Sequence, residues 1–199
     1  GKERLALAGP ATITLDRGSA VIDGLVIAAG TGRVSLAGRA GSNLDLKLGI
    51  RALPLALARI ASPSLALTGT LDGDADIRGT SARPEGRYAL SVAKLVTPET
   101  RKAGLPPIDA KASGTLGDGR AGIEGRVSAG RGAELTLAGF LPVSAGGPIA
   151  LKLRGTLDAA MANSLLSVGG QRVAGRIALD GGVSGTLDAP RAEGAATLS

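Results

Sequence analysis

The feature that most constrains the fold is a period of two in the hydrophobic pattern. In residues 44–48 leucine alternates with aspartate and lysine, and similar alternation returns in residues 64–68, 134–137 and 151–154. Successive side chains of a β-strand point to opposite faces of the sheet. Each of these segments therefore predicts a strand with leucine on one face and polar residues on the other.

Turn sequences separate these segments at short intervals. Residues 16–18, 29–32, 117–119, 146–148 and 180–182 are rich in glycine, aspartate and proline. Short amphipathic strands joined by tight turns predict an all-β antiparallel meander of roughly a dozen strands or more.

Two segments depart from this pattern. Residues 53–60 place Leu53, Leu57 and Ile60 on one helical stripe. Residues 158–165 place Met161 and Leu165 in line with the preceding Leu157, and Asp158 is a candidate N-cap residue. We expect one or two very short helices here. Each follows a Leu-Lys-Leu strand, so we interpret residues 1–199 as a single repetitive module with an approximate repeat between 46–91 and 151–199. The sequence begins without methionine, and we expect it to be a fragment of a longer chain.

The phrase Gly-Thr-Leu occurs four times, and its glycine shares the parity of the neighbouring leucines. A missing side chain on the apolar face would let each strand crease. We therefore predict that Gly69, Gly155 and Gly185 lie at bends on the concave side of the sheet. The alternative is that these glycines mark bulges or strand ends.

The composition argues against an enzyme. The chain has no histidine and no cysteine, so the usual general bases, thiolate nucleophiles and zinc ligands are missing. Residues 72–76 resemble part of a calcium loop, but they lack its glycine and its closing glutamate. Residues 117–122 match the dinucleotide fingerprint, yet a strand pattern follows where a helix is required. We expect no catalytic residues, no metal and no cofactor.

The charge distribution argues against a nucleic-acid partner. The net charge is +6, but the basic residues are scattered singly. With one phenylalanine, one tyrosine and no tryptophan, the chain has few aromatic side chains on which bases could stack. A solvated basic outer face explains the charge.

One closing block carries a family resemblance. It comprises residues 173–179, residues 183–191 and Gly194. The Gly-Thr-Leu phrases, and the Leu-Lys-Leu strands that precede short helical segments, belong to the same resemblance. These sequences resemble the TamB family, the inner-membrane-anchored subunit of the translocation and assembly module in the wider AsmA-like group. The resemblance covers most of the chain and is clearest from residue 151 to residue 199.

The resemblance implies a β-taco, which is a long sheet curled into a U-shaped gutter with an apolar interior. It also implies a periplasmic location, in a parent protein anchored in the inner membrane of a Gram-negative bacterium. Proteins of this family are linked to outer-membrane biogenesis, through phospholipid transport between the membranes and through protein assembly with a TamA barrel partner. The family's N-terminal anchor and its aromatic C-terminal end are missing from this sequence, so we expect contact with a TamA-like barrel only through other parts of the parent.

An aliphatic track without aromatic anchors also suits acyl chains on physical grounds, because it offers apolar contact without directional hydrogen bonds. We predict that one shared groove holds phospholipid acyl chains, with Thr68, Thr136, Lys152 and Arg154 facing solvent. The predicted lining residues are Leu46, Leu48, Leu65, Leu67, Leu71, Leu135, Leu137, Leu151, Leu153, Leu157, Val183 and Leu187.

Two other functions remain open on the sequence. The chain could be a chaperone-like scaffold for outer-membrane protein or autotransporter assembly and secretion, with its open sheet edge pairing with unfolded strands. It could also be a purely structural spacer with an ordinary closed core. All three functions require the leucine residues to lie on one face of the strands, so the sequence pattern does not distinguish them.

Overall fold

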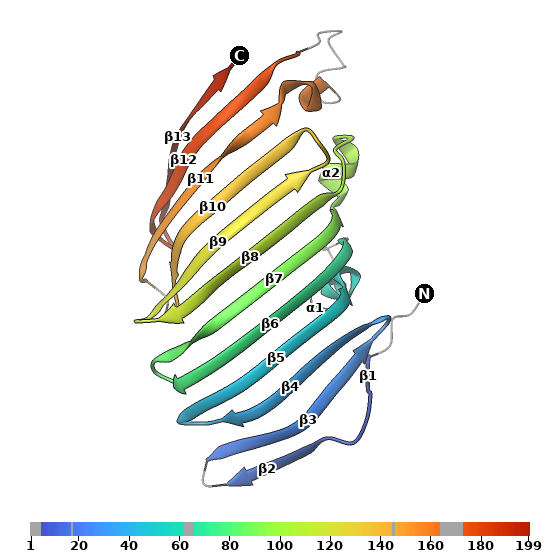
Figure 1. Cartoon of the computed structure of the whole chain (residues 1–199), viewed down its shortest axis with the longest axis vertical. Helices are drawn as coiled ribbons and strands as arrows, with labels where there is room; N and C mark the ends of the chain where they lie inside the picture. The colour runs from blue at the N-terminus through green and yellow to red at the C-terminus, as the bar shows by residue number, and fades with distance from the viewer. Residues whose placement is uncertain (1–4, 17, 62–65, 145, 164–172) are drawn as a thin grey trace.

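The computed structural model describes residues 5–16, 18–61, 66–144, 146–163 and 173–199. These residues form one antiparallel sheet of thirteen strands that does not close into a barrel (Figure 1). Neighbours in sequence are neighbours in the sheet from β3 to β13, while β1 and β2 both pair with β3. The strands are β1 (Leu5–Leu7), β2 (Thr12–Asp16), β3 (Ser19–Ala29), β4 (Gly32–Ala40), β5 (Asn43–Pro54), β6 (Thr68–Thr80), β7 (Pro84–Val96), β8 (Ile108–Gly117), β9 (Arg120–Ala129), β10 (Ala133–Pro142), β11 (Pro148–Asp158), β12 (Arg176–Thr186) and β13 (Pro190–Leu198). The predicted all-β meander is confirmed.

Short helices follow three of the strands. The 3₁₀-helix η1 (Leu55–Leu57) and α1 (Ala58–Ala61) follow β5, α2 (Pro98–Lys102) follows β7, and the 3₁₀-helix η2 (Ala159–Ala162) follows β11. All of them lie along the right-hand edge of the sheet in Figure 1. Asp158 caps η2 as predicted, because its carboxylate accepts a hydrogen bond of 2.9 Å from the backbone N–H of Ala160.

Helix α2 was not predicted. Its first turn is fixed by a reciprocal capping box in which the side chains of Thr97 and Thr100 each accept a hydrogen bond from the other residue's backbone N–H. Pro98 occupies the first turn, where its missing N–H costs nothing. The helix is only five residues long, so no hydrophobic period could reveal it.

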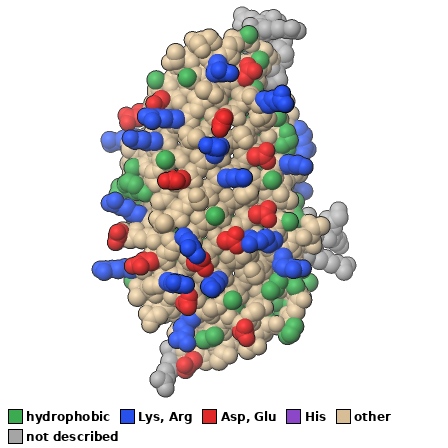
Figure 2. Space-filling model, in the orientation of Figure 1, with side chains coloured by type: hydrophobic (Ala, Val, Ile, Leu, Met, Phe, Trp, Pro, Cys, Tyr) green, Lys and Arg blue, Asp and Glu red, His purple; other side chains and the backbone are tan. Residues whose placement is uncertain are grey.

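The strand register separates two chemically different faces. Leu36, Leu48 and Ala75 lie opposite one another on β4, β5 and β6, whereas Arg154 lies directly opposite Asp180 on β11 and β12. Because opposed residues share a face, the pairing assigns nearly all the large aliphatic side chains to one side, the apolar face, and the charges of the strands to the other, the charged face. Figure 2 shows the charged face, with basic and acidic side chains distributed along most of its length.

The sheet is a single layer. Only five hydrophobic residues among the described ones are buried, four of them alanines, and no large side chain there is fully buried. The accessible surface is 12952 Å² for a chain of 19.5 kDa. A compact folded monomer of that mass would expose about 8,500 Å². The excess shows that no second layer of the described chain covers the apolar face.

The two stretches of the predicted repeat contain the same order of elements, and the repeat itself stays a prediction. Residues 46–91 contain most of β5, then η1 and α1, then β6 and the first part of β7. Residues 151–199 contain most of β11, then η2, then β12 and β13. Each stretch therefore consists of a strand, a short helix and two further strands.

Candidate functional site

The apolar face runs without a charged residue across all the described strands of the sheet. Residues aligned by successive strand pairings form tracks perpendicular to the strands, at a spacing of about 4.8 Å per strand, so a track from β3 to β13 is about 50 Å long. Along these tracks leucine, isoleucine and valine are interspersed with glycine and alanine. One track consists of Ile27, Val34, Ile50, Gly73, Leu90, Ala112, Gly125, Leu137, Leu153, Gly181 and Gly194.

The register brings most of the predicted lining residues together on this face. The residues placed there are Leu46, Leu48, Leu71, Leu135, Leu137, Leu151, Leu153, Leu157 and Val183. Leu187 lies in the turn between β12 and β13 and is 51% exposed. Leu67 precedes the first residue of β6, so the strand register does not place it, and Leu65 lies outside the described residues.

The strand register also places most of the polar residues that were predicted to face solvent. Thr136, Lys152 and Arg154 lie on the charged face, opposite one another or in adjacent rows of β10 and β11. Thr68 is exposed at the start of β6, next to an irregularity in the pairing of β6 with β7.

The exposed aliphatic side chains continue the apolar face to both ends of the sheet. Leu5, Leu7, Ile13 and Leu15, on β1 and β2, are 56%, 63%, 57% and 81% exposed. Leu198 on β13 is 58% exposed. Their cross-strand partners Ile27, Ile22 and Ile177 belong to the apolar face, so these side chains do too.

The three predicted bend glycines occupy crowded backbone positions. A Cβ at Gly155 would overlap the carbonyl oxygen of Glu134 on the neighbouring strand. Gly69 has φ +123° beside the register irregularity of β6, and Gly185 has φ +95° at the end of β12. The bulge and strand-end interpretation therefore describes Gly69 and Gly185 directly. That any of the three bends the sheet towards its apolar side stays a prediction.

Other glycines show the same crowding, and sequence analysis did not single them out. A Cβ at Gly38, Gly86, Gly114 or Gly139 would overlap a backbone carbonyl oxygen of the adjacent strand. All four share the apolar face. The sequence offered only one sign of them, which is that each glycine is an even number of residues away from the aliphatic residues of its strand and so shares their face.

Cross-strand ion pairs connect neighbouring strands on the charged face. Arg51 contacts Asp74 at 2.7 Å and Arg154 contacts Asp180 at 3.0 Å. The hydrogen bond and the negative charge of Asp74 raise the pKa of the Arg51 guanidinium above its ordinary value. Both pairs are solvent-exposed, so each contributes little stability.

A shallow hollow on the charged face does not make an anion site. It is lined by Arg51, Lys111 and Arg126, but also by three carboxylates, those of Asp72, Asp74 and Glu124. The opposing charges are equal in number, and the remaining lining is mostly small side chains. The concavity is therefore electrically balanced.

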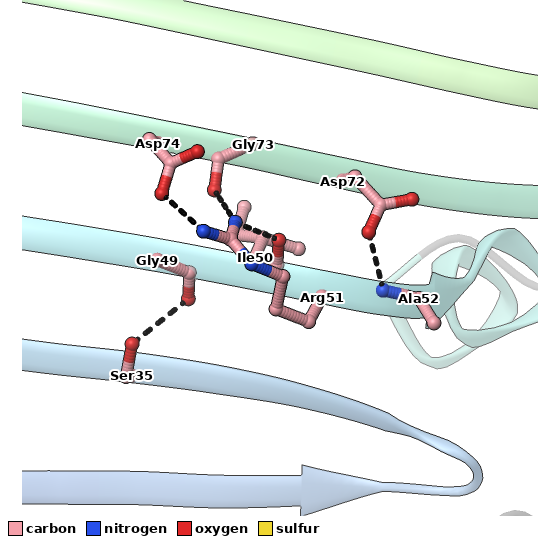
Figure 3. Close-up of polar contacts among 8 residues, drawn as sticks. All are labelled: Ser35, Gly49, Ile50, Arg51, Ala52, Asp72, Gly73 and Asp74. Carbon is pink, nitrogen blue, oxygen red and sulfur yellow. Dashed lines mark hydrogen bonds and ion pairs between the residues drawn. The ribbon is translucent and has the colours of Figure 1, made fainter.

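Figure 3 shows how the charged face accommodates a bulge in β5. Arg51 donates hydrogen bonds to the carbonyl oxygens of Ile50 and Gly73, at 2.9 and 3.0 Å. The next residue, Ala52, has φ 47°, and its backbone N–H donates to the carboxylate of Asp72 at 2.9 Å. Side chains here replace the hydrogen bonds that an irregular ladder loses.

The only tyrosine of the chain lies on the apolar face. Tyr88 on β7 is opposite Gly114 on β8, and its hydroxyl donates to the carbonyl oxygen of Gly122 on β9 at 2.9 Å. Burial raises the pKa of this phenol above its ordinary value. The side chain thus joins three strands across a glycine.

Among the described residues, no group of three or more acidic side chains could hold a metal ion. No described helix is long and apolar enough to cross a membrane. Neither a family model, nor a curated protein, nor a solved structure matches the chain. The resemblance to the TamB family therefore rests on the sequence phrases given above.

Proposed function

We propose that this chain is a non-enzymatic lipid-binding module whose apolar face holds phospholipid acyl chains as they move between the inner and outer membranes. The observation that carries the proposal is the uncovered apolar face of a single-layer sheet, in a molecule whose total accessible surface is 12952 Å². A sheet ordinarily buries its hydrophobic face against another layer, and a large uncovered apolar face marks an interaction surface.

The chemistry of the face supports acyl chains as its occupant. Its tracks consist of leucine, isoleucine, valine, alanine and glycine, with Tyr88 as the one aromatic side chain, whose hydroxyl is bonded to Gly122. Such a surface offers an acyl chain continuous apolar contact over about 50 Å without a polar group to arrest it. A closed spacer core is less compatible with side chains that remain half exposed.

In the setting that the TamB resemblance implies, the chain would be a segment of a periplasmic bridge, in a parent protein anchored in the inner membrane of a Gram-negative bacterium. Its role there would be outer-membrane biogenesis, with any TamA-like partner contacted by other parts of the parent.

The second candidate is a scaffold for outer-membrane protein assembly or secretion, and one observation favours it. Within the described segment β13 is the last strand in the sheet order, and a scaffold would pair the outer edge of such a strand with an unfolded strand. The two functions predict different cargo on different parts of the sheet, namely lipid on the face and polypeptide at the edge.

Native mass spectrometry of the protein purified from bacteria tests the proposal. Phospholipid retained by the folded protein and released by detergent supports the lipid function. A protein that carries neither phospholipid nor added fatty acid, although it is folded, contradicts it.

A further inference from the structure

The pairing of β8 with β9 has an interruption that is not a bulge. The register omits two successive pairs and then resumes in phase, and the omitted pairs are Gly114 with Ile123 and Thr115 with Gly122. Every other break in the register of the described strands comes with a shift of one residue. The gap between β8 and β9 is therefore a local loss of hydrogen bonding inside a straight ladder.

The lost contact is the hydrogen bond from the N–H of Thr115 to the C=O of Gly122. The two-residue turn that follows β8 has Asp118 at φ 50° and Gly119 at φ 69°, so the pair that closes it is hydrogen-bonded. Hydrogen-bonded pairs alternate, so Thr115 and Gly122 would exchange two bonds in a continuous ladder. Instead, the carbonyl oxygen of Gly122 accepts the hydroxyl of Tyr88 at 2.9 Å.

The hydroxyl that occupies this carbonyl belongs to the apolar face. Tyr88 has the only side chain with an oxygen or nitrogen atom that the register places on that face of the described strands. It reaches Gly122 because Gly114 lies between them without a side chain, and a Cβ there would be 3.0 Å from the hydroxyl oxygen. Tyr88 remains partly exposed, and the hollow beside it is lined by Gly114, Ile123 and Gly139 from the apolar face, together with residues of the charged face. These small residues leave room for a second acceptor next to the hydroxyl.

We infer that Tyr88 is the hydrogen-bond donor with which the apolar face recognises the ester carbonyl of an acyl lipid, an inference that rests on the lipid-binding function proposed above. A phenolic hydroxyl has one hydrogen to donate, so it bonds either to Gly122 or to an oxygen of the ligand. When an ester carbonyl takes this hydrogen, the carbonyl of Gly122 is released, accepts the N–H of Thr115 and completes the ladder. A hydrocarbon chain without a carbonyl offers no acceptor and leaves the interruption in place.

Competition between two lipids tests the inference. The protein is incubated with vesicles that contain equal amounts of a phosphatidylcholine with ester-linked chains and of its ether-linked analogue, and native mass spectrometry identifies the bound lipid. The wild-type protein should retain the ester lipid in about three- to tenfold excess, which is the contribution of one hydrogen bond. Tyr88→Phe removes only the hydroxyl and should retain both lipids equally. The matched control Ser35→Ala removes a hydroxyl that donates to the carbonyl of Gly49 at 3.3 Å on the charged face, and it should keep the preference.

Hydrogen exchange on the wild-type protein gives a readout that needs no variant. The amide of Thr115 should exchange quickly in the lipid-free protein and with the ether lipid, and slow down when the ester lipid binds. Equal retention of the two lipids by the wild-type protein, a preference that survives in Tyr88→Phe, or a Thr115 amide that does not respond to the ester lipid overturns the inference and leaves the lipid-binding function standing. A folded wild-type protein that retains neither lipid contradicts the lipid-binding function and this inference with it.

Discussion

Asp72 and Asp109 perform the same task on different strands. The carboxylate of Asp72 accepts a hydrogen bond of 2.9 Å from the N–H of Ala52, and that of Asp109 accepts one of 2.9 Å from the N–H of Lys94. Ala52 and Lys94 are bulge residues with φ 47° and 55°. An aspartate on the following strand thus satisfies a backbone donor that the irregular ladder leaves unpaired.

This arrangement predicts that Asp72→Ala lowers the free energy of unfolding by about 1 kcal/mol, because the Ala52 N–H loses its acceptor. Urea denaturation measures the change. The matched control is Asp74→Ala, which removes a carboxylate two residues away on the same face but breaks only an exposed contact with Arg51. Equal losses from the two substitutions would show that surface charge, and not the bulge, determines the stability.

Tyr88 allows a pH prediction, because it is the only tyrosine and the chain has no tryptophan. Its pKa is raised by burial, so the folded protein disfavours the phenolate. Stability from this group is complete below the ordinary tyrosine pKa of about 10 and is lost as pH rises above it, because the unfolded chain ionises first. Ultraviolet titration of the phenolate should show a midpoint above that of a denatured sample. A midpoint equal to the denatured one would mean that the phenol is not shielded from water.

At the scale of elements, the alternation of apolar and polar residues located three of the four segments that were predicted as strands. Residues 44–48, 134–137 and 151–154 all lie within strands, in β5, β10 and β11. Of residues 64–68, only Thr68 belongs to β6, residues 66 and 67 precede the strand, and residues 64 and 65 lie outside the described residues. Alternation records amphipathicity but not pairing, and residues 66 and 67 have no place in the ladder, which begins at Thr68.

Gly155 gives the element-scale prediction. Gly155→Val should lower the free energy of unfolding by about 1–3 kcal/mol, since the new side chain would overlap the carbonyl oxygen of Glu134 and force β10 and β11 apart. Gly117→Val is the matched control, because nothing lies within 4 Å of a Cβ there. Thermal unfolding of both variants measures the difference. If Gly155→Val melts like the control, the crowded approach of the two strands is not needed for the fold.

At the scale of the whole molecule, the sequence predicted which residues share a face but not what lies over that face. Parity follows from the backbone alone, so Leu135, Leu137, Leu151 and Leu153 could be assigned together from their spacing. Whether a second layer covers them depends on contacts between distant segments, which a period of two does not encode. The single-layer sheet, with its few buried alanines, answers that question for the described residues.

That openness separates the proposed lipid function from a structural core. Leu137→Asp and Leu153→Arg place a charge in the middle of the apolar face, on neighbouring strands. Because the face is open to water, the charge stays hydrated, and we expect the protein to remain folded with a loss of about 1 kcal/mol from the missing apolar contact. Acyl chains would then have to pass a solvated charge, which costs several kcal/mol. Bound phospholipid, and lipid transfer by the full-length parent, should therefore be lost.

The matched control for this last prediction is Thr136→Asp, which adds the same charge one residue away but on the charged face. It should leave both folding and lipid binding unchanged. Circular dichroism and native mass spectrometry on the same preparations distinguish the possible functions. Unfolding of Leu137→Asp would indicate a closed core, and unchanged lipid binding by folded Leu137→Asp would exclude the apolar face as the lipid site. Retained assembly of outer-membrane proteins by that variant would favour the scaffold function, because strand pairing at an edge does not depend on the face.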